Sequence, residues 1–315
     1  MKQRVVLLLP LLSLVLSASI FMQPMSASAA VHQAHKGKHH FFWKKGHARL
    51  AAANNNLIYH NGPVEVDTTQ VYAIFWEPTG SVVSSTYNEL LTRYFGDVGS
   101  STLYHNNIQY ADNSNQAPQN ATLANTWVDT AAYPSHHSPF SSPVVLDSDI
   151  QNEVSHAMTV NGWLPAINHA FFVFLAANEM LCIDSTFQQC SAPVGGFCAY
   201  HYFFTAPGSL TQTNYAAMPY DGNDLPGCYG LTTSPNNDPA ADAEISTTSH
   251  EQMEAATDPL GNAWFDNSGQ EIGDKCAYAY SSLNPDGSNV SWNKHAYIVQ
   301  SEWDNAVAGC MLKGP

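Results

Sequence analysis

Continuous apolar runs alternate with amphipathic segments along the middle of this chain. Residues 71–76 (VYAIFW) and 170–176 (AFFVFLA) are apolar without interruption, which is typical of strands covered on both faces. Residues 197–205 follow two glycines and form a third β-rich run. Residues 86–95 and 150–158 instead place apolar side chains three and four positions apart, as amphipathic helices do. The pattern predicts a mixed α+β fold of the α/β type, with a central mixed sheet and flanking helices in a single domain.

A further helix is expected over residues 239–257. Asn237 or Asp238 can cap its first turn, and proline suits the first helical position. The sequence Asp258-Pro259 disfavours helical backbone at Asp258, so the helix should end near Thr257. Asp258 itself is expected to cap the following turn with its side chain.

Weaker patterns complete the expected fold. A short strand is predicted around 108–110 and a C-terminal strand over 296–303. Residues 113–143, rich in Asn, Ser, Pro and Ala, should be largely loop, as should the stretch between residue 205 and the 239–257 helix.

The N-terminus has the features of a secretory leader. Lys2 and Arg4 precede an apolar run over 5–16, and an Ala-Ser-Ala cleavage sequence ends at Ala29. Residues 1–29 are therefore predicted to be a signal peptide, and the mature protein to be secreted, extracellular and without a membrane anchor. No later apolar run reaches the roughly 18 residues that a spanning helix needs.

Residues 30–56 form a basic segment with five histidines and no apolar periodicity. We expect a disordered arm there, with the folded domain over 57–315. Two other interpretations stay open: a metal-scavenging or wall-adhering tail, and docking of Phe41-Phe42-Trp43 onto the domain.

Charge is distributed very unevenly. From Leu57 onward the chain has 4 basic residues against 26 acidic residues, a formal charge of −22. Such a domain repels polyanions, so nucleic acid is excluded as a partner.

The six cysteines all lie in the second half of the chain. Their even number in an exported protein favours disulfides, and proximity in sequence favours Cys182–Cys190, Cys198–Cys228 and Cys276–Cys310. A structural zinc site is less compatible with the sequence because C-x-x-C pairs are absent.

The candidate metal-binding and catalytic residues lie in the sequence His250-Glu251-Gln252-Met253-Glu254, an H-E-x-x-E variant of the zincin helix. Residues i and i+4 share one helical face, so His250 and Glu254 can bind one metal ion while Glu251 lies beside it as a general base. The third ligand is expected from the following turn. Asp274, next to the half-cystine Cys276, is favoured, with Glu271 second and His201 third.

This donor set affects which ion can bind. Two carboxylates neutralise a divalent ion, so its bound water is less acidified than in a three-histidine site. Zn²⁺ is the expected cofactor, and Mn²⁺ or Ca²⁺ is also compatible with oxygen-rich ligation. The sequence contains no G-x-S-x-G elbow, P-loop or G-x-G-x-x-G motif, which disfavours serine hydrolases and nucleotide enzymes.

Several linked motifs resemble the EXORDIUM-like, phosphate-induced protein family. The resemblance runs through Tyr59-His60-Asn61-Gly62-Pro63 and Cys198-Ala199-Tyr200-His201 to the His250–Trp264 and Glu271–Cys276 blocks. It implies secretion and an extracellular or wall location, without an established reaction. The sequence thus predicts a secreted zincin-like hydrolase, a peptidase acting on peptides. The alternative is a non-catalytic extracellular protein that binds a cell-wall polymer.

Overall fold

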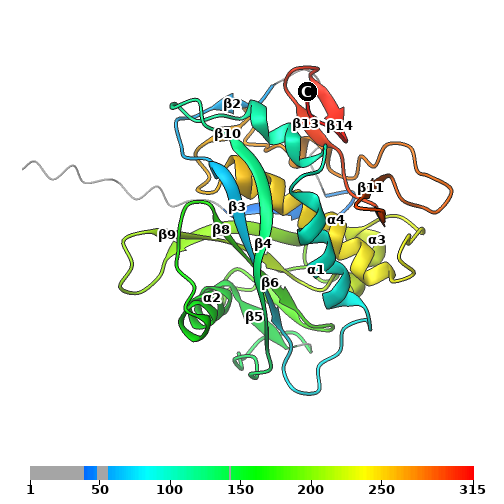
Figure 1. Ribbon diagram of the computed structural model, residues 1–315. Coiled ribbons are helices and arrows are strands. Elements are labelled where there is room, and N and C mark those ends of the chain that lie inside the picture. Colours follow the sequence, from blue (N-terminus) through cyan, green and yellow to red (C-terminus); the bar gives the residue numbers. More distant parts are fainter. Residues whose placement is uncertain (1–38, 48–55, 142) are drawn as a thin grey trace, which may run out of the picture. The chain divides into compact units, whose positions relative to one another are not determined.

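A six-stranded mixed sheet is the centre of the fold in the computed structural model, which describes residues 39–47, 56–141 and 143–315 (Figure 1). The strand order is β1 (His40–Trp43), β8 (Phe197–Thr205), β9 (Gln212–Met218), β6 (His169–Leu175), β3 (Asp67–Trp76) and β4 (Pro118–Asp129). Strands β9, β6, β3 and β4 are parallel, whereas β8 is antiparallel to β9 and β1 is antiparallel to β8. The predicted central mixed sheet is confirmed.

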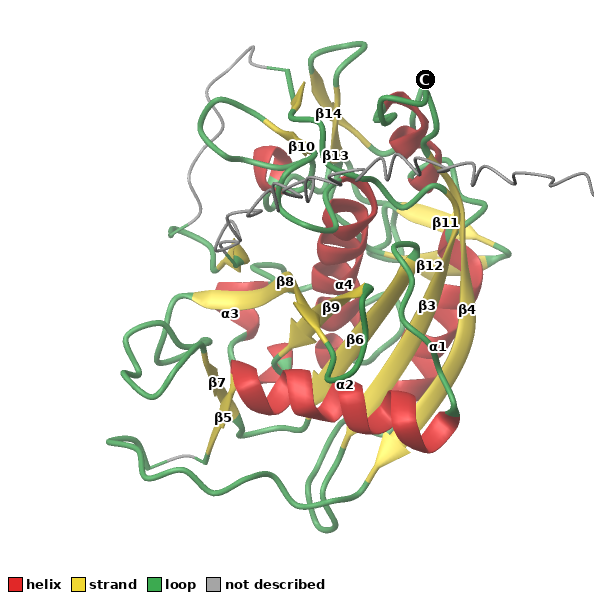
Figure 2. Ribbon diagram, turned by 90° about the vertical axis from the view of Figure 1, so that its left-hand side faces the viewer, coloured by secondary structure: helices red, strands yellow, loops and turns green. Residues whose placement is uncertain are grey.

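Helices cover both faces of this sheet (Figure 2). On one face, helices α1 (Tyr87–Val98) and α4 (Pro239–Thr257) share a hydrophobic core with Ala73 and Phe75 of β3. On the other face, α2 (Asp147–Asn161) shares a second hydrophobic core with Ile74 and Trp76 of the same strand. Because successive side chains of a strand point to opposite faces, two covered faces require the continuous apolar runs in the sequence.

Shorter elements complete the described structure. The remaining strands are β2 (Ile58–Tyr59), β5 (Val144–Leu146), β7 (Met180–Cys182), β10 (Trp264–Phe265), β11 (Val290–Trp292), β12 (His295–Tyr297), β13 (Glu302–Asp304) and β14 (Gly309–Met311). The remaining helical turns are η1 (Tyr104–Gln109), η2 (Asp221–Asn223), α3 (Leu225–Cys228) and η3 (Asp274–Cys276).

Helix α4 has the predicted bounds. The Asp238 side chain accepts a hydrogen bond from the Ala241 N–H and caps the first turn, with Pro239 at the first helical position. At the other end, one carboxylate oxygen of Asp258 accepts the backbone N–H groups of Asn262 and Ala263, both at 2.6 Å, as expected of a local cap. Every residue from Ala240 to Thr257 is buried, so the polar side chains of α4 lie inside the protein.

Four local predictions are wrong. Strand β4 occupies the middle of the predicted loop 113–143, and β9 lies in the predicted loop after residue 205. The η1 turn replaces the strand expected at 108–110, and the expected strand 296–303 is divided between β12 and β13. In β4 and β9, pairing with β3 and β6 supplies backbone partners that the sequence pattern does not signal.

The predicted disordered arm is wrong for residues 40–43. These residues form β1, in which Phe41 and Phe42 are buried, so the alternative of an aromatic cluster docked on the domain is the correct one there. The predicted signal peptide and residues 30–38 and 48–55 of the arm lie outside the described residues.

Three disulfides join the predicted pairs, Cys182–Cys190, Cys198–Cys228 and Cys276–Cys310. Within the described ranges, no helix combines the length and apolar character needed to cross a bilayer.

Candidate metal centre

Helix α4 places His250 and Glu254 on one face, one turn apart. The His250 Nε2 atom lies 3.1 Å from Glu254 Oε1, and both side chains are buried. The Phe42 ring of β1 covers the imidazole, with ring centroids 4.3 Å apart. Packing on a buried aromatic ring fixes the orientation of His250.

The loop that follows α4 brings Asp274 to this pair. A turn at Asp266, in which Gly269 N–H donates to the Asp266 carbonyl, reverses the chain toward the helix. Asp274 N–H then donates to Glu254 Oε1 at 2.9 Å. One donor atom each of His250, Glu254 and Asp274 lie within 4.8 Å of one another, so the structure brings the three predicted ligands together.

Glu251 points from α4 toward β8, where it meets His201. The His201 Nδ1 atom lies 3.1 Å from Glu251 Oε2 and 3.6 Å from Glu254 Oε2. Glu254 therefore bridges two groups of potential ligands, with one carboxylate oxygen facing His250 and the other facing His201.

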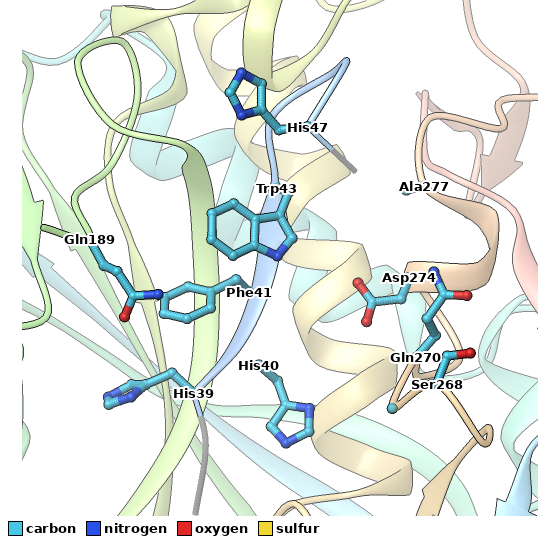
Figure 3. Close-up of a pocket in the computed structure, with 11 residues that line it drawn as sticks. His39, His40, Phe41, Trp43, His47, Gln189, Ser268, Gln270, Asp274 and Ala277 are labelled. Atoms are coloured by element: carbon cyan, nitrogen blue, oxygen red, sulfur yellow. The ribbon is translucent and has the colours of Figure 1, made fainter. Parts of the chain in front are cut away.

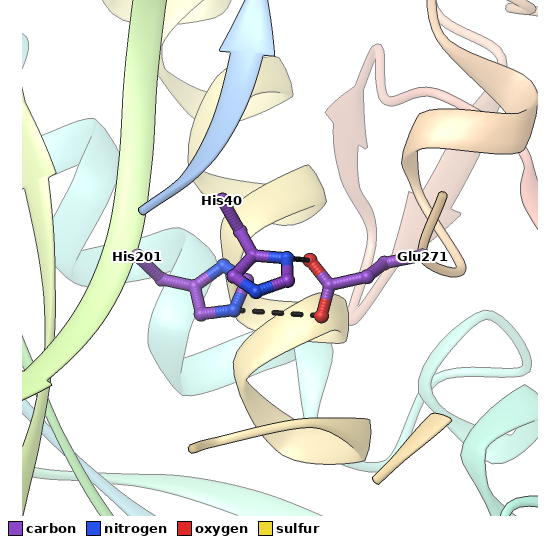
Figure 4. Close-up of side chains that lie close together, drawn as sticks. All are labelled: His40, His201 and Glu271. Carbon is purple, nitrogen blue, oxygen red and sulfur yellow. Dashed lines mark ion pairs between the residues drawn. The ribbon is translucent and has the colours of Figure 1, made fainter. Parts of the chain in front are cut away.

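Glu271, the second choice for third ligand, contacts a different pair of side chains (Figure 4). Its Oε2 atom lies 2.6 Å from His40 Nδ1, and its Oε1 atom lies 3.7 Å from His201 Nε2. His40 belongs to β1 and faces His201 across the paired strands, with the two rings stacked at 5.2 Å.

Burial and mutual proximity shift the pKa values of these groups strongly. Burial lowers the pKa of His250, but the neighbouring carboxylates of Glu254, Glu251 and Asp274 together outweigh burial and raise it to about 9. Burial raises the pKa of Glu254, but His250, His201 and His40 together outweigh burial and bring it to about 2. Burial, together with repulsion from Glu254, raises the pKa of Glu251 and Glu271 far above the usual range and that of Asp274 to about 8. A divalent cation would release these protons on binding.

The cluster is formed by the side chains described above: His40, His201, His250, Glu251, Glu254, Glu271 and Asp274. It contains more carboxylates than its histidines can neutralise. Lys275, the basic residue next to Asp274 in sequence, is engaged elsewhere: its Nζ atom lies 3.2 Å from Asp266 and 4.2 Å from the centre of the Trp303 ring. Burial also raises the pKa of Glu302 well above its usual range, with Glu254 and Asp274 adding repulsion. The environment therefore favours a cation.

Several buried atoms in this region lack a hydrogen bond. They include His250 Nδ1, His201 Nε2 and both carboxylate oxygens of Glu302. Buried polar groups in folded proteins are normally paired, and an ion is a common reason for exceptions. The donor types and spacings fit a divalent ion held by His250, Glu254 and Asp274.

A pocket of about 410 Å³ adjoins the cluster (Figure 3). Strand β1 lines one side with His40, Phe41 and Trp43, and the loop carrying Asp274 lines the other. Asp274 is half-buried, whereas His250 and Glu251 are fully buried. Asp274 and His40 are thus the cluster residues that connect it to the pocket.

Sequence reasoning gave His201 too little weight and missed His40 and Glu302. His201 lies three residues after a half-cystine in a family-like block, which was a usable signal. His40 is one of several histidines in a basic segment, and nothing local distinguishes it. Glu302 becomes notable only because the tertiary structure buries it beside Glu254 and Asp274.

The fold and the cluster define a mixed α+β protein with a buried, histidine-containing and carboxylate-rich candidate metal centre. The chain is 28% identical over 197 residues to Protein EXORDIUM-like 3 of Arabidopsis thaliana, with 51% of this chain and 55% of the relative covered. This similarity supports assignment to the EXORDIUM-like family. The match spans about half the length of that curated relative. No family model matches the chain. No solved structure matches it either.

Proposed function

We propose that the protein is a secreted metal-dependent hydrolase that cleaves peptides. The observation that carries the proposal is the meeting of His250, Glu254 and Asp274, of which Asp274 lines the 410 Å³ pocket. Zn²⁺ is the ion expected there, and Mn²⁺ or Ca²⁺ also suits the two carboxylates. The signal sequence and the three disulfides support secretion.

The bound ion would polarise a substrate carbonyl and acidify water. Glu251 would serve as the general base that accepts a proton from water. Two observations support this role: Glu251 follows the proposed ligand His250 directly on α4, and its carboxylate lies 3.1 Å from His201 Nδ1. Two carboxylate ligands weaken the acidification of water, so a buried base beside the ion gains importance.

A peptide is the favoured substrate because of the strand that lines the pocket. Strand β1 is one of the two edge strands of the sheet, and its residues form one wall of the pocket. An edge strand can bind an extended peptide through main-chain hydrogen bonds. β1 itself shows the principle, because it joins β8 as an antiparallel extended segment.

Metal content and peptide hydrolysis, measured on the same samples, test the proposal. Wild-type protein purified without added metal should contain stoichiometric ion by mass spectrometry and cleave members of a peptide library. His250→Ala should lose the ion from this site. Glu251→Gln should keep its metal and lose hydrolysis by a factor of about 10² or more.

Two results would overturn the proposal. One is negligible metal in wild-type protein and in His250→Ala alike. The other is metal binding without hydrolysis, with wild type and Glu251→Gln binding a cell-wall polysaccharide equally well. The second result would establish a non-catalytic binding protein instead.

A further inference from the structure

The side chains of His40, His201 and Glu271 form a group distinct from the three ligands proposed above. One donor atom of each lies within 4.8 Å of the other two. The group draws on three separate parts of the chain: the N-terminal strand β1, the strand β8 and the loop after α4 (Figure 4). None of its members is His250, Glu254 or Asp274.

The orientation of His201 is that of a metal ligand. Its Nδ1 atom lies 3.1 Å from Glu251 Oε2, a distance at which an Nδ1–H group donates to the carboxylate. Histidines that bind metals through one ring nitrogen normally donate the other N–H to a carboxylate or carbonyl. The remaining atom, Nε2, is buried, has no hydrogen bond and faces Glu271 Oε1 at 3.7 Å.

The distances around Glu271 also suit an ion. Donors bound at about 2.0–2.1 Å in tetrahedral geometry are separated by roughly 3.4 Å. The His201–Glu271 separation of 3.7 Å is close to that value, whereas His40 Nδ1 and Glu271 Oε2 are in direct contact at 2.6 Å. His40 is 16% exposed on a short edge strand, so a small displacement of its side chain admits an ion.

We propose that His40, His201 and Glu271 bind a second divalent transition-metal ion, and that this ion fixes strand β1 to the domain. Two histidines and one glutamate are a donor set that zinc uses in proteins. Strand β1 has four residues and pairs only along β8 among the described strands, so a bond from His40 to an ion adds a strong tether. The tether holds one wall of the pocket in place.

Metal stoichiometry of the full chain tests this site separately from the first. Protein freed of metal, saturated with Zn²⁺ and passed through a desalting column should retain two ions per chain. His40→Ala and His250→Ala should each retain one. His47→Ala is the matched control, because His47 is exposed and lies on the same segment without joining the cluster, and it should retain two.

Hydrogen exchange gives a second measurement that does not depend on counting ions. Zn²⁺ should slow amide exchange of a peptide spanning Phe41–Trp43 by at least tenfold in wild type, in His250→Ala and in His47→Ala. It should have no effect on that peptide in His40→Ala, and circular dichroism should show that this variant remains folded.

The outcomes separate the two proposed sites. One ion that is lost in His250→Ala and retained in His40→Ala overturns the second site and leaves the first. One ion that is lost in His40→Ala and retained in His250→Ala supports the second site and overturns the first. One ion lost in both variants, no ion in wild type, or β1 exchange that does not respond to Zn²⁺ overturns the second site.

Discussion

At the scale of single residues, the environment of His250 shows how closely the cluster is packed. A Cβ atom added to Gly273 would lie 2.5 Å from His250 Nδ1, a separation that real side chains do not adopt. The Phe42 ring also packs against this imidazole, with ring centroids 4.3 Å apart. The backbone φ of Gly273 is −77°, which any residue can adopt, so backbone conformation does not require glycine here. The close approach of the loop to the His250 ring does.

Substituting Gly273→Ala should displace His250 and weaken metal binding by about tenfold or more, since ligand geometry controls affinity. Competition with a chromogenic chelator measures this change. Gly96→Ala is the control, because Gly96 lies in helix α1 and a methyl group there would meet no atom within 4 Å. That substitution should leave metal affinity unchanged, and equal affinities for all three proteins would show that packing on His250 is unimportant.

Glu65 is a second residue whose burial has a measurable consequence, away from the proposed ligands. Its carboxylate accepts hydrogen bonds from Thr69 and Asn214, both at 2.6 Å. Burial outweighs these bonds and raises the pKa to about 8 from its usual 4.5. In the unfolded chain Glu65 ionises above pH 4.5, whereas in the folded protein it keeps its proton up to about pH 8.

The contribution of Glu65 to the free energy of unfolding should therefore fall as pH rises from about 4.5 to 8. Glu65→Gln removes this titration and should gain on the order of 4 kcal/mol relative to wild type between pH 4 and pH 8. Urea unfolding at both pH values measures the difference. Glu89→Gln, at an exposed position, should show little pH-dependent gain, and a Glu65→Gln difference that is constant with pH would contradict the assignment.

At the scale of elements, the sequence correctly predicted the helices and strands whose ends are marked by neighbouring residues. Helix α4 has the predicted range because Asp238 and Pro239 begin it and Asp258-Pro259 ends it. Strand β8 also has the predicted range, since glycines precede a continuous β-rich run. The capping residues and apolar patterns of these elements depend only on neighbours in sequence.

Elements that depend on distant partners were not predictable in the same way. Strand β4 is half exposed and polar, and its identity as a strand rests on parallel pairing with β3 over ten positions. Strand β1 lies in a basic segment that resembles a disordered arm, and only the edge of β8 gives it a partner. Consequently His40, which β1 carries, could not be assigned to the cluster from sequence.

At the scale of the whole molecule, disulfides connect the candidate centre to the C-terminal strands. Cys276 lies two residues after Asp274 in η3, and its partner Cys310 lies in β14. This bond closes a segment with a sequence separation of 34, against 8 for Cys182–Cys190, which joins segments that supply no proposed ligand. Variants that lack one disulfide or the other therefore distinguish an effect on stability from an effect on metal binding.

Replacing both Cys276 and Cys310 by Ser should lower the free energy of unfolding by about 4 kcal/mol, from the entropy of loop closure. It should also weaken metal binding by several-fold, because Asp274 loses its anchor. The matched Cys182→Ser and Cys190→Ser pair should cost about 2–3 kcal/mol and leave metal affinity unchanged. Chemical denaturation and chelator competition measure the two quantities, and equal metal affinity in both double variants would contradict the anchoring role.

The sequence by itself determined the buried strands, helix α4, the three cysteine pairs and the two proposed ligands that are one helical turn apart. These features follow from local periodicity, capping, proximity along the chain and the geometry of residues i and i+4. The sequence also ranked Asp274 above Glu271 as the third ligand, and the tertiary structure brings Asp274 to His250 and Glu254. It was tertiary packing alone that joined His40 to His201 and Glu271, and that buried Glu302 near Glu254 and Asp274. Those contacts join segments that are far apart in the sequence, and only strand pairing and burial of the shared core bring such segments together.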